Sequence, residues 1–146
     1  MDHPFWIRIL FTVVCGFIIG IERQMKGKPV GIRTSILICM GTMLFIYLGI
    51  QIQGGTEVAR VLGQVITGIG FLGGGVIMTR GDIVSGVTSA AIVWLLAGIG
   101  AAIGFQLYNV AFTICLVALS ILIGVERLED VFKKLQQGVH KRKQEE

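Results

Sequence analysis

Apolar residues fill five long runs of this chain, and short segments between the runs hold most of its charges. No Asp, Glu, Lys or Arg occurs between Asp82 and Glu126. A helix that crosses a bilayer needs roughly 20 apolar residues, so this stretch alone is long enough for two crossings. The pattern predicts an all-α polytopic membrane protein, a bundle of five transmembrane helices. The expected spans are residues 4–21, 33–53, 61–79, 83–104 and 106–125.

Basic residues predict how the bundle sits in the membrane. With five spans, all of the 13 lysines and arginines except Arg8 and Arg60 fall on one side. Lysine and arginine favour the cytoplasmic side of a membrane. The N-terminus is therefore expected outside and the C-terminus in the cytoplasm, and the net charge of +4 becomes a topology signal rather than a nucleic-acid footprint.

The last residues carry a pattern of their own. Apolar residues recur at helical spacing after Arg127, and the segment ends in basic residues. We expect a transmembrane domain over residues 1–127 and a cytoplasmic amphipathic basic tail over 128–146. Two arrangements remain open: the tail lies on the inner membrane surface, or it continues the fifth span into water.

Composition agrees with a membrane protein and offers little to an enzyme. Charged residues make up 15% of the chain, against about 25% in soluble domains. His3 and His140 lie near opposite ends, so neither a Ser/His/Asp set nor a Cys/His metal site is indicated. The three cysteines all fall in apolar spans and are expected to be unpaired fillers. We therefore predict no enzymatic activity, no metal and no cofactor.

Glycines are the second conspicuous feature. Gly68, Gly70 and Gly73 match the dinucleotide fingerprint, but they lie inside an apolar span without the strand and acidic residue that the motif needs. Glycines that let helices approach closely are the better interpretation. A functional break at residues 73–75 is the alternative. The predicted packing glycines are Gly16, Gly20, Gly68, Gly70, Gly73, Gly74, Gly100 and Gly104, with Gly70 and Gly74 at a close contact with a neighbouring span or across a dimer.

The five-span topology gathers the polar residues at one level, the inner leaflet. Acidic, basic and hydroxyl side chains close one span or open the next at that level. Ordinary interfacial charges would give the same pattern, but ionisable residues within a membrane often mark functional sites. The predicted pocket residues are Glu22, Arg23, Arg33, Thr34, Arg80, Asp82, Ser85, Thr88, Glu126 and Arg127.

One ion pair is predicted within this set. The stretch from Arg8 to Glu22 is too short to cross a core of roughly 30 Å with both charges in water. A carboxylate drawn toward the membrane needs a partner. Arg33 opens the next span at the same depth, so we predict a buried or half-buried pair between Glu22 and Arg33.

Four motifs together resemble one family. The segments GIERQ (20–24), GIRT (31–34), QVITGIGFLGGGVI (64–77) and VSGVTSAAIVW (84–94) are similar to those of the MgtC/SapB family of bacterial inner-membrane proteins. The resemblance covers residues 10–125. It implies a multi-pass protein of the bacterial cytoplasmic membrane, linked to magnesium limitation and to stress or virulence adaptation. Some members of this family inhibit the ATP synthase, so the resemblance also implies that activity. Members often carry a soluble C-terminal domain, so this chain is expected to be a short form.

Three function classes follow. The first is a non-enzymatic regulator that acts through a membrane-protein partner or lipid, with a polar inner-leaflet pocket. The second is a small ion or proton transporter, which the mixture of carboxylates and arginines and the lack of acidic residues at mid-span disfavour. The third is a structural protein that interacts with anionic lipid. The expected partners are the bilayer, possible membrane proteins such as the ATP synthase, and a second copy in a homodimer, but no nucleic acid.

Overall fold

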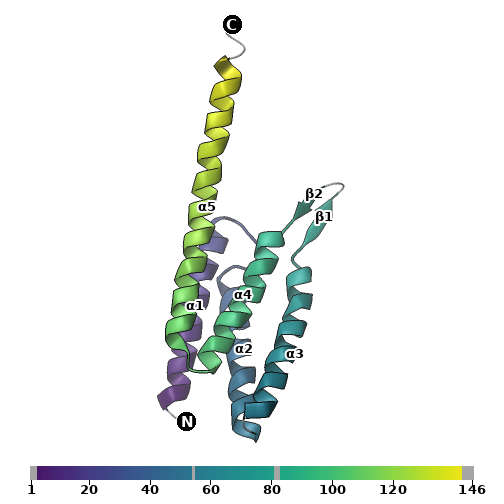
Figure 1. Ribbon diagram of the computed structural model, residues 1–146, viewed down its shortest axis with the longest axis vertical. Coiled ribbons are helices and arrows are strands. Elements are labelled where there is room, and N and C mark those ends of the chain that lie inside the picture. The colour runs from purple at the N-terminus through teal and green to yellow at the C-terminus, as the bar shows by residue number, and fades with distance from the viewer. Residues whose placement is uncertain (1–2, 54, 81–82, 143–146) are drawn as a thin grey trace.

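A computed structural model describes residues 3–53, 55–80 and 83–142. Within these residues the chain forms five helices and one short hairpin (Figure 1). In chain order the elements are α1 (His3–Met25), α2 (Ile32–Gln53), α3 (Gly55–Gly74), β1 (Met78–Arg80), β2 (Ile83–Ser85), α4 (Val87–Gly104) and α5 (Tyr108–Arg142).

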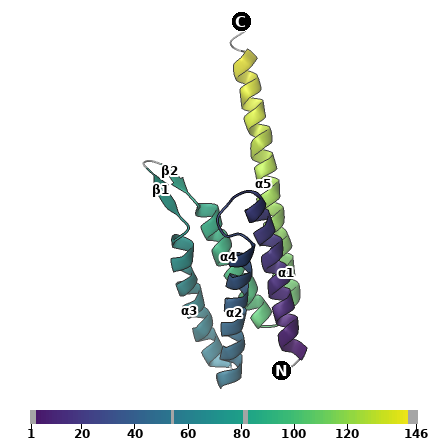
Figure 2. The same cartoon turned by 180° about the vertical axis from the view of Figure 1, so that it is seen from behind.

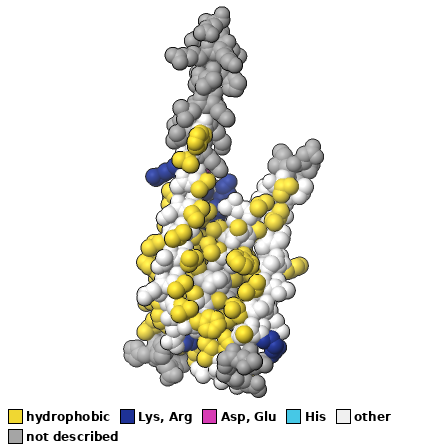
Figure 3. All heavy atoms as spheres, in the orientation of Figure 1, with side chains coloured by type: hydrophobic (Ala, Val, Ile, Leu, Met, Phe, Trp, Pro, Cys, Tyr) yellow, Lys and Arg dark blue, Asp and Glu magenta, His cyan; other side chains and the backbone are white. Residues whose placement is uncertain are grey.

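Four of the helices, α1, α2, α4 and α5, are long and apolar enough to cross a membrane. The apolar part of α3 that qualifies, Val58–Gly74, is shorter. The predicted helical, membrane-type fold is confirmed at this level, and the crossing by α3 stays a prediction. On the face seen in Figure 3, hydrophobic side chains cover the bundle while Lys and Arg lie near its two ends. A surface of this kind suits a surrounding of lipid.

Helix α4 lies at the centre of the bundle, where it contacts all four other helices. Helix α2 packs against α1, α3 and α4, while α5 packs against α1 and α4 (Figures 1 and 2). Fully buried Ile19, Met43 and Leu96 come from three of these helices. The loop between α1 and α2 is held by the Ser35 hydroxyl, which donates to the Val30 carbonyl at 3.1 Å.

Glycines bring α2 close to its two main neighbours. A Cβ atom on Gly20 of α1 would come within 2.6 Å of the Ile32 Cα, and one on Gly16 within 2.6 Å of the Ile36 Cα. On α4, a Cβ at Gly100 would lie 2.3 Å from the Cys39 carbonyl oxygen. A Cβ at Gly104 would lie 2.7 Å from the Ile46 Cβ. Only glycine permits such backbone approaches.

The predicted glycines of α3 lie differently. Among the described residues, a Cβ atom on Gly68, Gly70 or Gly74 would meet nothing within 4 Å, and one on Gly73 would make only an ordinary contact with Ala90. The predicted close contact of Gly70 and Gly74 with a neighbouring span of the same chain is therefore wrong. The reason is the rotation of α3, which turns Ile69 and Gly73 inward and these two glycines outward.

A hairpin replaces the ends of two predicted spans. Residues 61–79 and 83–104 were predicted as helical spans, with a break at residues 73–75 as the alternative, and α3 ends at Gly74 while α4 begins at Val87. The run Gly73–Gly75 disfavours helix, and β-branched residues follow it. Thr79 then pairs with Val84 in an antiparallel register. Gly86, with φ of 88°, joins the hairpin to α4, and a Cβ there would lie 2.2 Å from the Val76 carbonyl oxygen.

Helices α1 and α5 extend beyond their predicted spans. Helix α1 continues past residue 21 to Met25, so Glu22 lies within a helix. Helix α5 is one helix from Tyr108 to Arg142 and projects beyond the bundle (Figure 1). The helix thus continues into the tail, and the position of the tail relative to the membrane stays a prediction. It runs across the predicted domain boundary at residue 127 without interruption.

Candidate functional site

A cavity of about 580 Å³ opens between α1, α4, α5 and the hairpin. It lies at the end of the bundle from which α5 projects (Figure 1). We call it the charged pocket. Its polar lining comes from the last turn of α1, the following loop, the end of β2, the first turn of α4 and one side chain of α5: Glu22, Arg23, Lys26, Lys28, Ser85, Thr88, Ser89 and Glu126.

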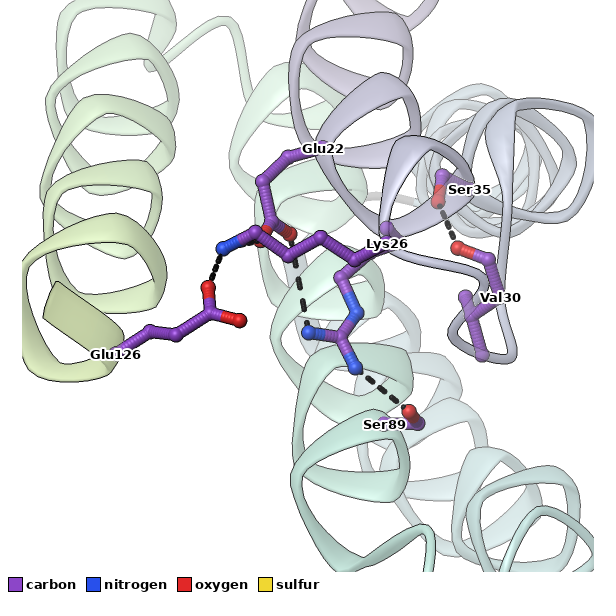
Figure 4. A network of polar contacts seen from close by, with 7 residues as sticks. Glu22, Lys26, Val30, Ser35, Ser89 and Glu126 are labelled. Carbon is purple, nitrogen blue, oxygen red and sulfur yellow. Dashed lines mark hydrogen bonds and ion pairs between the residues drawn. The ribbon is translucent and has the colours of Figure 1, made fainter. Parts of the chain in front are cut away.

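Lys26 stands between two carboxylates. Its Nζ lies 2.8 Å from Glu22 Oε1, one helical turn earlier, and it also forms an ion pair with Glu126 of α5 (Figure 4). Glu22 is buried, with 7% of its surface exposed, whereas the Glu126 side chain is 45% exposed. The buried carboxylate is thus compensated on one side by a cation that also joins α1 to α5.

Arg23 links α1 to the start of α4. Its Nη2 donates to Ser89 Oγ at 2.9 Å, and its Nη1 lies 3.7 Å from Glu22 Oε2. Only 5% of Arg23 is exposed, and its Nε has no acceptor among the described residues. The two Nη groups of Arg23 therefore have partners within the chain, while its Nε is enclosed by protein.

The N-terminus of α4 forms another wall of the pocket. Gly86, Val87, Thr88 and Ser89 line the cavity, and Gly86 provides no side chain to cap the helix. The first N–H groups of a helix have no partner within that helix and carry a partial positive charge. The pocket therefore combines hydrogen-bond donors and cations on the α1 and α4 sides with carboxylates on the α5 side.

The structure brings together half of the predicted pocket residues. Glu22, Arg23, Ser85, Thr88 and Glu126 line the cavity. Thr34 instead lines a separate cavity between α2 and α3, and Arg127 is exposed outside the lining. Arg80 belongs to β1, but its side chain, like the whole of Asp82, lies outside the described part of the chain.

The predicted ion pair of Glu22 with Arg33 is wrong. Arg33 is exposed, and Glu22 is paired with Lys26 and Arg23. The phase of α2 explains the difference: Ile32 faces Gly20 of α1, and the next residue is turned about 100° away from that contact. Lys26 was missed because the first helix was expected to end at residue 21. The signal was present as the i, i+4 spacing from Glu22.

A second buried charge lies near the opposite end of the bundle. Arg8 is 4% exposed, and its guanidinium carbon is 4.8 Å from the centre of the Tyr47 ring. The aromatic contact covers its guanidinium within the bundle. Between the two ends, Cys15, Cys39 and Cys115 are buried and unpaired. No group of three His, Cys, Asp or Glu residues suited to a metal occurs within the described ranges.

Comparisons with known proteins give a consistent result. Residues 9–131 match the MgtC family. The chain is 36% identical over 138 residues to Protein SrpB of Synechococcus elongatus, covering 85% of the chain and 76% of that protein. It is 38% identical over 117 residues to the Escherichia coli K12 protein named "Putative magnesium transporter YhiD", covering 75% of the chain. It is 35% identical over 144 residues to Protein SapB of Bacillus subtilis, covering 92% of the chain.

The matched region spans only part of two of these relatives, 54% of YhiD and 61% of SapB. No solved structure matches the chain.

Proposed function

Because the chain belongs to the MgtC family, as its motifs had predicted, we propose that it is a non-enzymatic regulatory protein of the bacterial inner membrane. It acts by contact with a membrane partner, and the charged pocket is the centre of that role. Its physiological setting is magnesium limitation and stress or virulence adaptation. The family resemblance supports this setting, and so does the word magnesium in the name of the E. coli relative.

The charge asymmetry supports placing the pocket at the cytoplasmic face. If α3 also crosses the membrane, the chain crosses it five times. All lysines and arginines except Arg8 and Arg60 then fall on the side of the pocket. A reporter fused after Glu146 should then behave as cytoplasmic, and one inserted at Gly55 as external. A periplasmic signal from the C-terminal fusion would show that the charged pocket does not lie at the cytoplasmic face.

The location of the buried charges favours a regulator over a transporter. Among the described residues, the buried charged side chains are Arg8 near one end of the bundle and the adjacent Glu22 and Arg23 near the other. The buried hydroxyls of Thr12 and Ser35 donate to the backbone carbonyls of Ile9 and Val30, and Thr42 places one further buried hydroxyl in the middle of α2. A stepwise cation path would need ionisable or free polar groups between these levels.

The test combines growth with flux. Wild-type protein should restore growth at low magnesium to a bacterium that lacks its own copy, and Glu22→Gln should fail to do so at equal abundance in the membrane. Arg33→Gln is the matched control. Arg33 is a charged residue at the start of α2, at the same end of the bundle as the pocket, but it does not line the pocket. Purified protein in proteoliposomes should give no magnesium or proton flux above empty vesicles. A saturable flux abolished by Glu22→Gln would instead establish the transporter.

Partner identity is tested separately. We expect a membrane protein to co-purify in fixed stoichiometry with the wild type, and the ATP synthase is the candidate that the family resemblance supplies. A second copy of the chain is the other expected partner. Retention of an anionic lipid with no protein partner and no growth phenotype would favour a structural, lipid-interacting role.

A further inference from the structure

We propose that the charged pocket binds the phosphate group of a membrane phospholipid, whose acyl chain lies in an apolar groove along α5. This inference rests on the proposed function for placing the pocket within the membrane. It adds the chemical class of the ligand, which neither the family match nor the relatives' names supply.

The start of α4 forms the phosphate-binding wall. The helix begins at Val87 behind a glycine that leaves the backbone open, and its first turn lines the cavity. Backbone N–H groups at a helix N-terminus, aided by the helix dipole, bind phosphate. The exposed Thr88 hydroxyl lines the same wall, and the Ser85 hydroxyl beside it donates to the Met78 carbonyl at 3.3 Å.

A buried side chain provides the second, independent observation. Arg23 is 95% removed from solvent, lines the pocket and is anchored to the same first turn through Ser89. Its positive charge is offset by Glu22 at 3.7 Å, a carboxylate that Lys26 also engages. A phosphate group in the cavity would lie beside this guanidinium, and pairing between guanidinium and phosphate is favourable.

The charge balance of the pocket also fits a phosphodiester. Lys26 is engaged by Glu22 and Glu126, so those three residues together contribute about one negative charge. Arg23 and Lys28 add two positive charges, and Lys28 is an exposed lining residue with no ion pair in the described part of the chain. The remaining single positive charge matches the single negative charge of a phosphodiester.

An apolar groove of about 450 Å³ continues from the pocket along α5. The two cavities share Ile121 and Val125. Exposed Leu116, Val117 and Leu128 line the rest of this groove together with Ser120, whose hydroxyl donates to the Leu116 carbonyl. Gly124 leaves its middle open, with no atom of the described residues within 4 Å of a Cβ placed there. An open apolar furrow that leads directly from a phosphate-binding end suits an acyl chain, which free phosphate lacks.

The experiment measures lipid retention by native mass spectrometry of full-length protein taken from nanodiscs. The probes are phosphatidylglycerol, a neutral diacylglycerol with the same chains, and inorganic phosphate. Lys28→Ser removes a phosphate contact, and Gly124→Phe fills the groove. Arg33→Ser is the charge-matched control at the same end of the bundle. None of the three positions supports buried packing, so all variants should fold.

Wild type and Arg33→Ser should retain one phosphatidylglycerol, and Lys28→Ser should weaken retention by about tenfold, the usual effect of one charged hydrogen bond. Gly124→Phe should weaken it to a similar degree. Equal retention of diacylglycerol, or equal losses in Lys28→Ser and Arg33→Ser, would overturn the proposal. Tight binding of inorganic phosphate with no effect of Gly124→Phe would replace the lipid with a soluble phosphate. Because the readout is lipid binding in vitro, its failure would leave the growth and flux tests of the proposed function intact.

Discussion

Lys26 of α1 and Glu126 of α5 form an ion pair that joins two helices at the charged pocket. The same ammonium lies 2.8 Å from Glu22, whose carboxylate is buried. Lys26 therefore pairs with one buried carboxylate and one half-exposed carboxylate. The buried pair should contribute more to the free energy of unfolding, because solvent screens the exposed pair.

We predict that Lys26→Met costs more stability than Glu126→Gln. The first change leaves Glu22 buried with only Arg23 at 3.7 Å, and should lower the free energy of unfolding by about 1–3 kcal/mol. The second removes the exposed partner and should cost less than about 1 kcal/mol. Chemical unfolding in bicelles measures both. Equal losses would mean that the Glu22 carboxylate is not buried as described.

Ser89 provides the next prediction. Its hydroxyl accepts from buried Arg23 at 2.9 Å, so Ser89→Ala leaves a guanidinium N–H without an acceptor. A loss of about 1–3 kcal/mol in unfolding free energy is expected. Thr88→Ala, one residue earlier and exposed, is the control and should be close to neutral. Similar values for the two variants would contradict the buried Arg23–Ser89 contact.

Two glycines of α4 form a matched pair. Gly100→Ala forces a Cβ to 2.3 Å from the Cys39 carbonyl oxygen, so α2 and α4 must separate, at a cost of about 1–3 kcal/mol. Gly98 lies in the same helix with nothing within 4 Å of a Cβ, so Gly98→Ala should unfold at or above the wild-type temperature. If both variants behave alike, the α2–α4 approach is looser than the structure has it.

The outward glycines of α3 test the proposed dimer. Gly70→Leu and Gly74→Leu add bulk where the described part of the chain has no atom within 4 Å of a Cβ. They should leave the monomer fold intact while reducing the dimer fraction, because small residues allow close contact between helices in a membrane. Light scattering in detergent measures the oligomer size. An unchanged dimer, or the absence of any dimer in the wild type, would exclude this face as the interface.

The extent to which the fold could be predicted varies along the chain. Helix α2 begins and ends within one residue of the predicted span 33–53, because charges and Gln53 bound an uninterrupted apolar run. The hairpin was missed because three-residue strands between glycine-rich segments give no periodic signal. The hydrophobic pattern continues through them just as it would through a helix.

The sequence predicted the depth of the pocket residues in the membrane but not which of their side chains face one another. Charge spacing placed Glu22, Arg33 and Glu126 at one depth, and depth needs only the number of spans. Which of them meet depends on the rotation of each helix about its axis. That rotation is fixed by the glycine contacts at Gly16 and Gly20, whose partners on α2 cannot be identified from one sequence. Because the rotation of the helices was unknown, Arg33 was predicted as the partner of Glu22 although it is exposed, and Lys26 was overlooked.

Helix α5 has 35 residues, so at 1.5 Å per residue it is a rod of roughly 50 Å, well beyond a hydrocarbon core of roughly 30 Å. Glu126 lies about midway along it, where Lys26 ties the rod to the bundle. Because this contact lies near the middle of α5, a sideways displacement of the C-terminal half of the helix would act on the Lys26–Glu126 ion pair. Through Lys26 it would also act on the buried carboxylate of Glu22.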